Sequence, residues 1–206
     1  MPARRVTRTR VASLATAAQT GSAAVLGTFL VSHVLAPFSA ALVPHAAADV
    51  ASRAMLFGRV YYQNAVLEPL LVWGALGVHV VAGLVRRAAA RPKRRGSWDP
   101  RRWGYAQWHV LSGYVLLPTA LVHLLANRVV PAHEGAPAHA LSPAELDMEY
   151  VALGFRYFPY VSAALYAALI AAAAVHGPGG ASVTSRWVCA YASYVQVWPY
   201  AAAATR

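Results

Sequence analysis

Residues 112–126, SGYVLLPTALVHLLA, form an apolar stretch without a formal charge, in which a histidine follows the first serine after eleven positions. Residues 22–36, SAAVLGTFLVSHVLA, repeat that pattern, so that Ser22 and His33 match Ser112 and His123. An unsatisfied polar group inside hydrocarbon costs several kcal/mol, so a membrane histidine needs a partner. Each stretch therefore predicts a membrane helix that packs its histidine against another helix.

The composition is that of a membrane protein. Hydrophobic residues make up 58% of the 206 residues and charged residues only 12%, whereas soluble domains carry about 25% charged residues. A spanning helix needs about 20 apolar residues. We predict a basic N-terminal tail at 1–18 and a transmembrane domain at 19–206, in which the fifth segment either crosses the membrane or lies on it. The predicted segments are 19–40, 66–87, 106–127, 157–178 and 187–205.

The return helices repeat as well. Arg59 precedes His79 by twenty positions, and Arg156 precedes His176 by the same distance. A glycine follows each of these histidines after four positions. The sequence therefore predicts an all-α, polytopic bundle of four to five helices, built as two similar helical hairpins. We expect the first span to end at Pro37, because proline disfavours helix in the residue before it.

Basic residues gather in two segments that two crossings separate, which places both segments on one side of the membrane. The positive-inside rule makes this the cytosolic side. Such a face serves as a topology signal or as a surface for anionic lipids or a partner, and nucleic-acid binding is not needed to explain it. The basic residues are Arg4, Arg5, Arg8 and Arg10 in the first segment, and Arg86, Arg87, Arg91, Lys93, Arg94, Arg95, Arg101 and Arg102 in the second.

The N-terminal segment has two interpretations. Its arginines alternate with Thr7, Thr9 and Ser13, and no acidic residue occurs before Asp49, which is the composition of a mitochondrial transit peptide. The same residues would equally form a simple basic flank of the first span.

Four histidines are candidate cofactor ligands, one on each predicted long helix: His33, His79, His123 and His176. Two imidazoles that face each other from different helices can hold haem b. The alternative is that each histidine bonds a neighbouring helix and only packs the bundle. Glu68 is expected to serve in structural pairing, with Arg59 or Arg156 as its candidate ion partner, and the alternatives are a carboxylate that reaches the membrane surface or a member of a proton relay. We find no nucleophile and base at useful spacing and predict no enzyme activity and no other metal site.

Several motifs resemble one family. They are the 108–118 stretch WHVLSGYVLLP, the NRVVP at 127–131 that follows His123, the SHVLAP at 32–37, and Tyr61-Tyr62-Gln63 followed by Glu68-Pro69. Together they resemble the transmembrane domain of the fungal mitochondrial outer-membrane adaptors that compensate for loss of the tether between endoplasmic reticulum and mitochondria. The resemblance covers about residues 20 to 180.

This resemblance implies a multi-pass protein of the mitochondrial outer membrane that supports lipid homeostasis and recruits a bridge-like lipid-transfer protein. The recruiting Pro-x-Pro motif of the family is absent from this sequence. The family is itself similar to the cytochrome b anchors of succinate dehydrogenase and fumarate reductase, in which helix histidines hold haem b in the inner membrane. That similarity gives the alternative function, although His109-x2-Ser112-Gly113 lacks the arginine that follows the histidine in those anchors.

Overall fold

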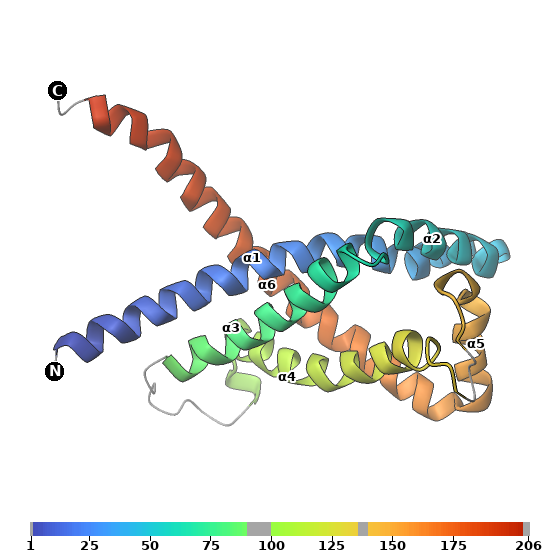
Figure 1. Ribbon diagram of the computed structural model, residues 1–206. Coiled ribbons are helices and arrows are strands. Elements are labelled where there is room, and N and C mark those ends of the chain that lie inside the picture. The colour runs from blue at the N-terminus through green and yellow to red at the C-terminus, as the bar shows by residue number, and fades with distance from the viewer. Residues whose placement is uncertain (1, 90–99, 136–139, 204–206) are drawn as a thin grey trace.

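The computed structural model describes residues 2–89, 100–135 and 140–203, and these residues form helices and turns without a strand. The predicted all-α fold is confirmed. Six α-helices are joined by short 3-10 and π-helical segments (Figure 1). The α-helices are α1 (Pro2–Leu42), α2 (Ala47–Tyr62), α3 (Ala75–Ala89), α4 (Tyr105–Leu124), α5 (Met148–Tyr157) and α6 (Pro159–Ala203). The short segments are η1 (Pro44–Ala46), η2 (Glu68–Gly74), η3 (Pro100–Arg102), η4 (Leu125–Val129) and η5 (Pro143–Glu145).

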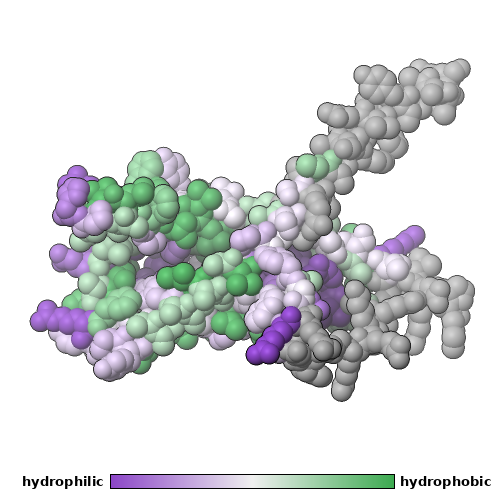
Figure 2. All heavy atoms as spheres, turned by 180° about the vertical axis from the view of Figure 1, so that it is seen from behind, coloured by the Kyte–Doolittle hydropathy of each residue, from purple (hydrophilic) through white to green (hydrophobic). Residues whose placement is uncertain are grey.

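Four helical stretches are long and apolar enough to cross a membrane: Thr9–Leu42, Glu68–Ala89, Tyr105–Val129 and Pro159–Ser182. They lie close to the first four predicted spans. Many large apolar side chains point outward from them, and the green apolar surface in Figure 2 covers the middle of the bundle. Purple hydrophilic residues gather toward its ends. This surface suits lipid around the middle, and the chain is therefore a multi-pass membrane protein.

The bundle consists of two hairpins with the same plan. Helix α1 packs against α3, α4 packs against α6, and the hairpins meet where α1 crosses α6. A short helix closes each turn, and these two helices, α2 and α5, contact each other at one end (Figure 1). Helix α1 begins, α3 ends and α4 begins at the other end, which we call the basic end. The predicted repeat of hairpins is confirmed.

The first helix differs from the expectation at both of its ends. Helix α1 starts at Pro2, so residues 2–18 continue the span as helix, and it passes through Pro37 to Leu42. Proline is tolerated in a membrane helix because neighbouring groups satisfy the freed backbone. Next to Pro37, the Ser39 hydroxyl donates to the carbonyl of Ala36 at 2.8 Å. Ending the helix there would instead expose further backbone groups to hydrocarbon.

The C-terminal region also differs from the expectation. Residues 187–203 continue α6 and form no separate helix, so one helix of 45 residues replaces the predicted fourth and fifth segments. At 1.5 Å per residue, α6 is about 68 Å long, about twice the thickness of the hydrocarbon core. Figure 1 shows its C-terminal half leaving the bundle on the side of the basic end. The Gly-Pro-Gly-Gly segment at 177–180 does not interrupt α6.

Candidate functional site

Two layers of histidines lie inside the bundle. The basic-end layer contains Gln19, His79, His109 and His176, one residue from each long helix. Nδ1 of His79 lies 3.2 Å from the carbonyl oxygen of Gln19, and Nδ1 of His176 lies 3.0 Å from the carbonyl oxygen of His109. Gln19 and His109 are equivalent in the sequence repeat, ninety positions apart. Both hairpins therefore bind their return histidine through the same contact.

The repeated serines serve this contact. The hydroxyl of Ser22 donates to the carbonyl of Gln19 at 3.0 Å, and the hydroxyl of Ser112 donates to the carbonyl of His109 at 2.9 Å. Each carbonyl thus accepts from a serine and faces a histidine. Both serines are buried, so the shared carbonyl satisfies polar groups that lipid could not satisfy.

Glycines let α4 and α6 approach closely in this layer. A Cβ at Gly113 would lie 2.9 Å from the His176 ring, and a Cβ at Gly179 would lie 2.6 Å from the Tyr105 ring. The rings of His109 and His176 stack with centroids 4.1 Å apart, and Nδ1 of His109 lies 3.1 Å from the carbonyl oxygen of His176. Small residues at helix contacts commonly allow such approach in membranes.

The hydrogen bonds fix the tautomers of His79 and His176. A carbonyl only accepts, so the Nδ1 that faces it carries the proton and Nε2 keeps its lone pair. That is the form in which a histidine binds a metal, with the second ring nitrogen held by a carbonyl. The rings of His79 and His176 come from different hairpins, and their centroids are 6.1 Å apart at 80°.

The opposite-end layer contains His33 of α1 and His123 of α4, with ring centroids 5.8 Å apart at 84°. Aromatic rings hold His33: Phe29 stacks on it at 5.1 Å, and Tyr62 lies edge-on at 6.5 Å. The Asn127 amide nitrogen lies 3.3 Å from Nδ1 of His123 and donates to the carbonyl of His123 at 2.8 Å.

Both pairs have the spacing that haem requires. An iron held by two imidazoles at about 2 Å per bond sets the ring centres about 6 Å apart. The four predicted histidines thus form two pairs across the hairpins, at two depths. Neutral imidazoles are the donor type that haem b takes, and the carbonyl contacts of His79 and His176 leave Nε2 of each ring with its lone pair. Within residues 9–89, 100–135 and 140–182, no group of three or more His, Cys, Asp or Glu side chains forms another metal site.

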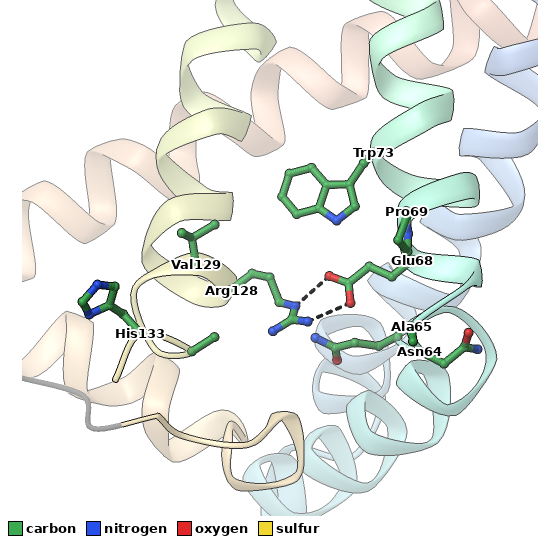
Figure 3. Close-up of a pocket in the computed structure, with 10 residues that line it drawn as sticks. Asn64, Ala65, Glu68, Pro69, Trp73, Arg128, Val129 and His133 are labelled. Atoms are coloured by element: carbon green, nitrogen blue, oxygen red, sulfur yellow. Dashed lines mark hydrogen bonds and ion pairs between the residues drawn. The ribbon is translucent and has the colours of Figure 1, made fainter. Parts of the chain in front are cut away.

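An ion pair joins the hairpins beyond the opposite-end layer. Arg128 donates from Nε to Glu68 Oε1 at 2.7 Å and from Nη2 to Glu68 Oε2 at 2.8 Å (Figure 3). The side chain of Glu68 is 12% exposed and that of Arg128 is 31% exposed. The prediction that Glu68 pairs with Arg59 or Arg156 is therefore wrong. Two parallel hydrogen bonds between a guanidinium and a carboxylate are the strongest geometry for such a pair.

Arg59 instead fastens the two hairpin turns together. Its Nη1 donates to the carbonyl of Pro143 at 2.6 Å and to the carbonyl of Leu146. Burial is the main cause that lowers the pKa of Arg59, and burial likewise raises the pKa of Tyr62. The segment around Leu146 is thus partly buried, and Leu146 itself is 2% exposed.

The structure describes three residues of the predicted basic surface in full: Arg86, Arg87 and Arg101. Arg86 is half-buried, Arg101 is exposed, and Arg87 lies over the Tyr114 ring at 5.4 Å. Cation–π contact of this kind anchors an arginine at the membrane surface. The other members of this predicted surface, Arg91, Lys93, Arg94, Arg95 and the side chain of Arg102, lie outside the described part of the chain.

The sequence did not indicate Gln19 as a contributor to the basic-end layer or Arg128 as the partner of Glu68. Gln19 contributes its carbonyl, and the ninety-residue offset of the repeat could have paired it with His109. Arg128 was recognised only as part of a motif, because nothing in the sequence indicates its approach to Glu68.

No protein-family model, curated protein or solved structure matches this chain.

Proposed function

We propose that this protein binds haem b in its bundle and acts as a cytochrome-type membrane protein. The observation that carries the proposal is the two histidine pairs that face each other across the hairpins. His79 and His176 would hold one haem, and His33 and His123 would hold a second. Haem held by two histidines supplies reversible one-electron transfer.

The chain itself contributes orientation and exclusion of water. The carbonyls of Gln19 and His109 hold the rings of His79 and His176 in the ligating tautomer. The apolar exterior places both pairs within hydrocarbon, away from bulk water. The role proposed for such a site is electron transfer or structural binding of the haem.

An absorption spectrum of the purified full chain, titrated with haemin, tests this function. We expect a Soret band and the narrow reduced-state bands of bis-histidine haem. The variant carrying H33L, H79L, H123L and H176L should lose these bands, whereas H45L, outside the four spans, should keep them. Equal spectra of wild type and the fourfold variant would refute haem binding.

The second candidate is a non-enzymatic adaptor of the mitochondrial outer membrane that supports lipid homeostasis at contact sites. The basic end favours it, because Arg87 and Arg101 are exposed there beside the start of α4. Such a face attracts anionic membrane lipids or an acidic partner, which by resemblance would be a bridge-like lipid-transfer protein. Glu68 and Arg128, which both belong to the motifs that carry the resemblance, also contact each other.

Loss of the gene separates the candidates. An adaptor predicts altered mitochondrial phospholipids and morphology, and an uncleaved protein at the outer membrane. A haem-binding anchor in the inner membrane predicts lost succinate-dependent respiration with normal lipids. Replacing Arg86, Arg87 and Arg101 with alanine should weaken adaptor function, whereas R53A, whose arginine pairs with Asp49 at the other end, should not.

A further inference from the structure

An open cavity of about 540 Å³ lies at the end of the bundle opposite the basic end. Its main walls are η2, which carries Glu68 and Trp73, and η4, which carries Arg128 (Figure 3). Both segments are π-helical, and the described part of the chain has no other π-helical segment. Turns of this kind are rare and often occur at functional sites. The volume is within the usual range of about 300 to 1,000 Å³ for small-molecule sites.

The π-helical turn places two side chains of η2 one above the other. Hydrogen bonds in such a turn join residues five apart, so Trp73 lies about one turn beyond Glu68 on nearly the same face. An α-helix would rotate Trp73 away by about 140°. Glu68 begins the second span and Val129 ends the third, so the ion pair lies at the membrane boundary. Trp73 therefore lies deeper, toward the hydrocarbon.

Two N–H groups on the cavity walls have no protein acceptor among the described residues. Arg128 uses Nε and Nη2 for Glu68, which leaves Nη1 on the far side of the guanidinium. The other donor is the indole N–H of Trp73, which Figure 3 shows on the edge of the ring that faces the ion pair. A buried indole N–H usually finds an acceptor. The cavity therefore offers donors at two depths, one at the boundary and one below it.

The ion pair makes the cavity neutral while it leaves both charges within reach. The side chain of Glu68 is 12% exposed and that of Arg128 is 31% exposed. Each carboxylate oxygen of Glu68 accepts one hydrogen bond from Arg128 and has a lone pair for a second. A lone anion would meet the carboxylate, and a lone cation would meet the guanidinium. The complementary ligand therefore carries both charges.

From these features we infer that the cavity binds a zwitterionic phospholipid with an ethanolamine head. The phosphate accepts from Nη1 of Arg128, and the ammonium donates to the Glu68 carboxylate. An ester carbonyl, which lies deeper than the phosphate in a phospholipid, accepts from the Trp73 indole. Ethanolamine is favoured over choline, because a trimethylammonium group is larger and has no N–H to donate to a carboxylate that is mostly buried.

The inference goes beyond haem binding and beyond the adaptor function. It depends on neither, since the cavity lies outside both histidine layers and at the opposite end from the basic surface.

Photo-labelling of the full chain in phosphatidylcholine nanodiscs tests the inference. Three probes share one diazirine acyl chain and differ in the head: phosphatidylethanolamine, phosphatidylcholine and phosphatidic acid. We expect the phosphatidylethanolamine probe to label segments 68–73 and 128–133 about threefold or more above the other two, the difference that one hydrogen bond makes. Equal labelling by the three probes, strongest labelling by phosphatidic acid, or labelling spread evenly over all four spans would overturn the site.

A variant of Trp73 tests the deeper contact. W73F keeps an aromatic ring and removes the N–H, so labelling of these segments by the phosphatidylethanolamine probe should fall by about three- to tenfold, the usual contribution of one neutral hydrogen bond. The matched control W108F, at a tryptophan of α4 near the basic end, should leave labelling unchanged. Unchanged labelling in W73F would refute the placement of the lipid.

Charge provides an independent arm. E68Q removes the acceptor of the ammonium and leaves Arg128 cationic, so phosphatidic acid should become the strongest probe at these segments. The double variant E68Q/R128Q removes both charges and should label alike with all three probes. A retained preference for phosphatidylethanolamine in E68Q would place the head elsewhere and overturn the inference. W73F leaves the ion pair intact and decides the question if E68Q unfolds in nanodiscs.

Discussion

The two histidine layers arise from the same repeat, yet different contacts hold them. In the basic-end layer, backbone carbonyls hold His79 and His176 and leave Nε2 of each ring with its lone pair. In the opposite-end layer, aromatic rings hold His33, and the Asn127 amide contacts Nδ1 of His123. The repeat therefore places the histidines, whereas their neighbours decide which ring nitrogen can bind a metal.

Separate removal of each pair gives the largest expected effect. In H33L/H123L only the basic-end pair remains, and in H79L/H176L only the opposite-end pair remains. We expect the first variant to bind haemin about tenfold or more tightly than the second, because oriented second ring nitrogens improve ligation by that order. Haemin titration followed by absorbance measures both constants. Equal affinities would show that the carbonyl contacts do not distinguish the layers.

The next largest effect is expected on stability, when the ion pair between Glu68 and Arg128 beyond the opposite-end layer is broken. E68L leaves the half-buried Arg128 without its partner, which should reduce the free energy of unfolding by about 1 to 3 kcal/mol. The double variant E68L/R128L should recover most of this loss, since no charge remains buried. Denaturant titration in detergent micelles measures the change. A loss in the double variant as large as in E68L would show that packing, and not the unpaired charge, is responsible.

Close helix approach distinguishes the basic-end layer. In G179A the new Cβ would lie 2.6 Å from Tyr105 Cε1 and 2.8 Å from His109 Nδ1, so overpacking should cost about 1 to 3 kcal/mol. G177A, two residues away in α6, meets no atom within 4 Å and should be neutral or slightly stabilising. Thermal unfolding of the two variants compares them directly. Equal stability would mean that α4 and α6 separate easily.

The smallest loss of stability is expected when the repeated serines, Ser22 and Ser112, are replaced. S22A and S112A each remove one hydroxyl from the carbonyl that a histidine shares, which should reduce stability by about 0.6 kcal/mol. The losses should be similar if the hairpins are equivalent. A clearly larger loss in S112A would instead indicate that the stacked ring of His109 makes the second hairpin more sensitive.

The sequence was sufficient for the helices and the repeat, because apolar length and histidine spacing are local properties. The four spans lie close to their predicted places, and all four histidines face partners in the other hairpin. The contacts within the candidate site were harder to predict from the sequence. The contact of Gln19 with His79 uses a backbone carbonyl, which every residue has, so side-chain chemistry could not indicate it.

The errors have a common physical cause. The first span was predicted to end at Pro37 and the fourth at residue 178, but α1 and α6 continue through both positions. In water these residues often end a helix, whereas in lipid an interrupted helix would leave backbone groups unsatisfied. The partner of Glu68 depended on how η4 turns Arg128 toward it, and that rotation has no signature in residue spacing.

The length of α6 has a mechanical consequence. The helix continues from the stacked ring of His176 through Gly-Pro-Gly-Gly into the half that leaves the bundle. At the start of this segment, Tyr105 Oη donates to the carbonyl of Val175 at 2.8 Å, and His109 contacts the carbonyl of His176. The projecting half of α6 is thus continuous with the helical turn that carries His176, a candidate haem ligand. A force applied to its far end would act on the orientation of the His176 imidazole.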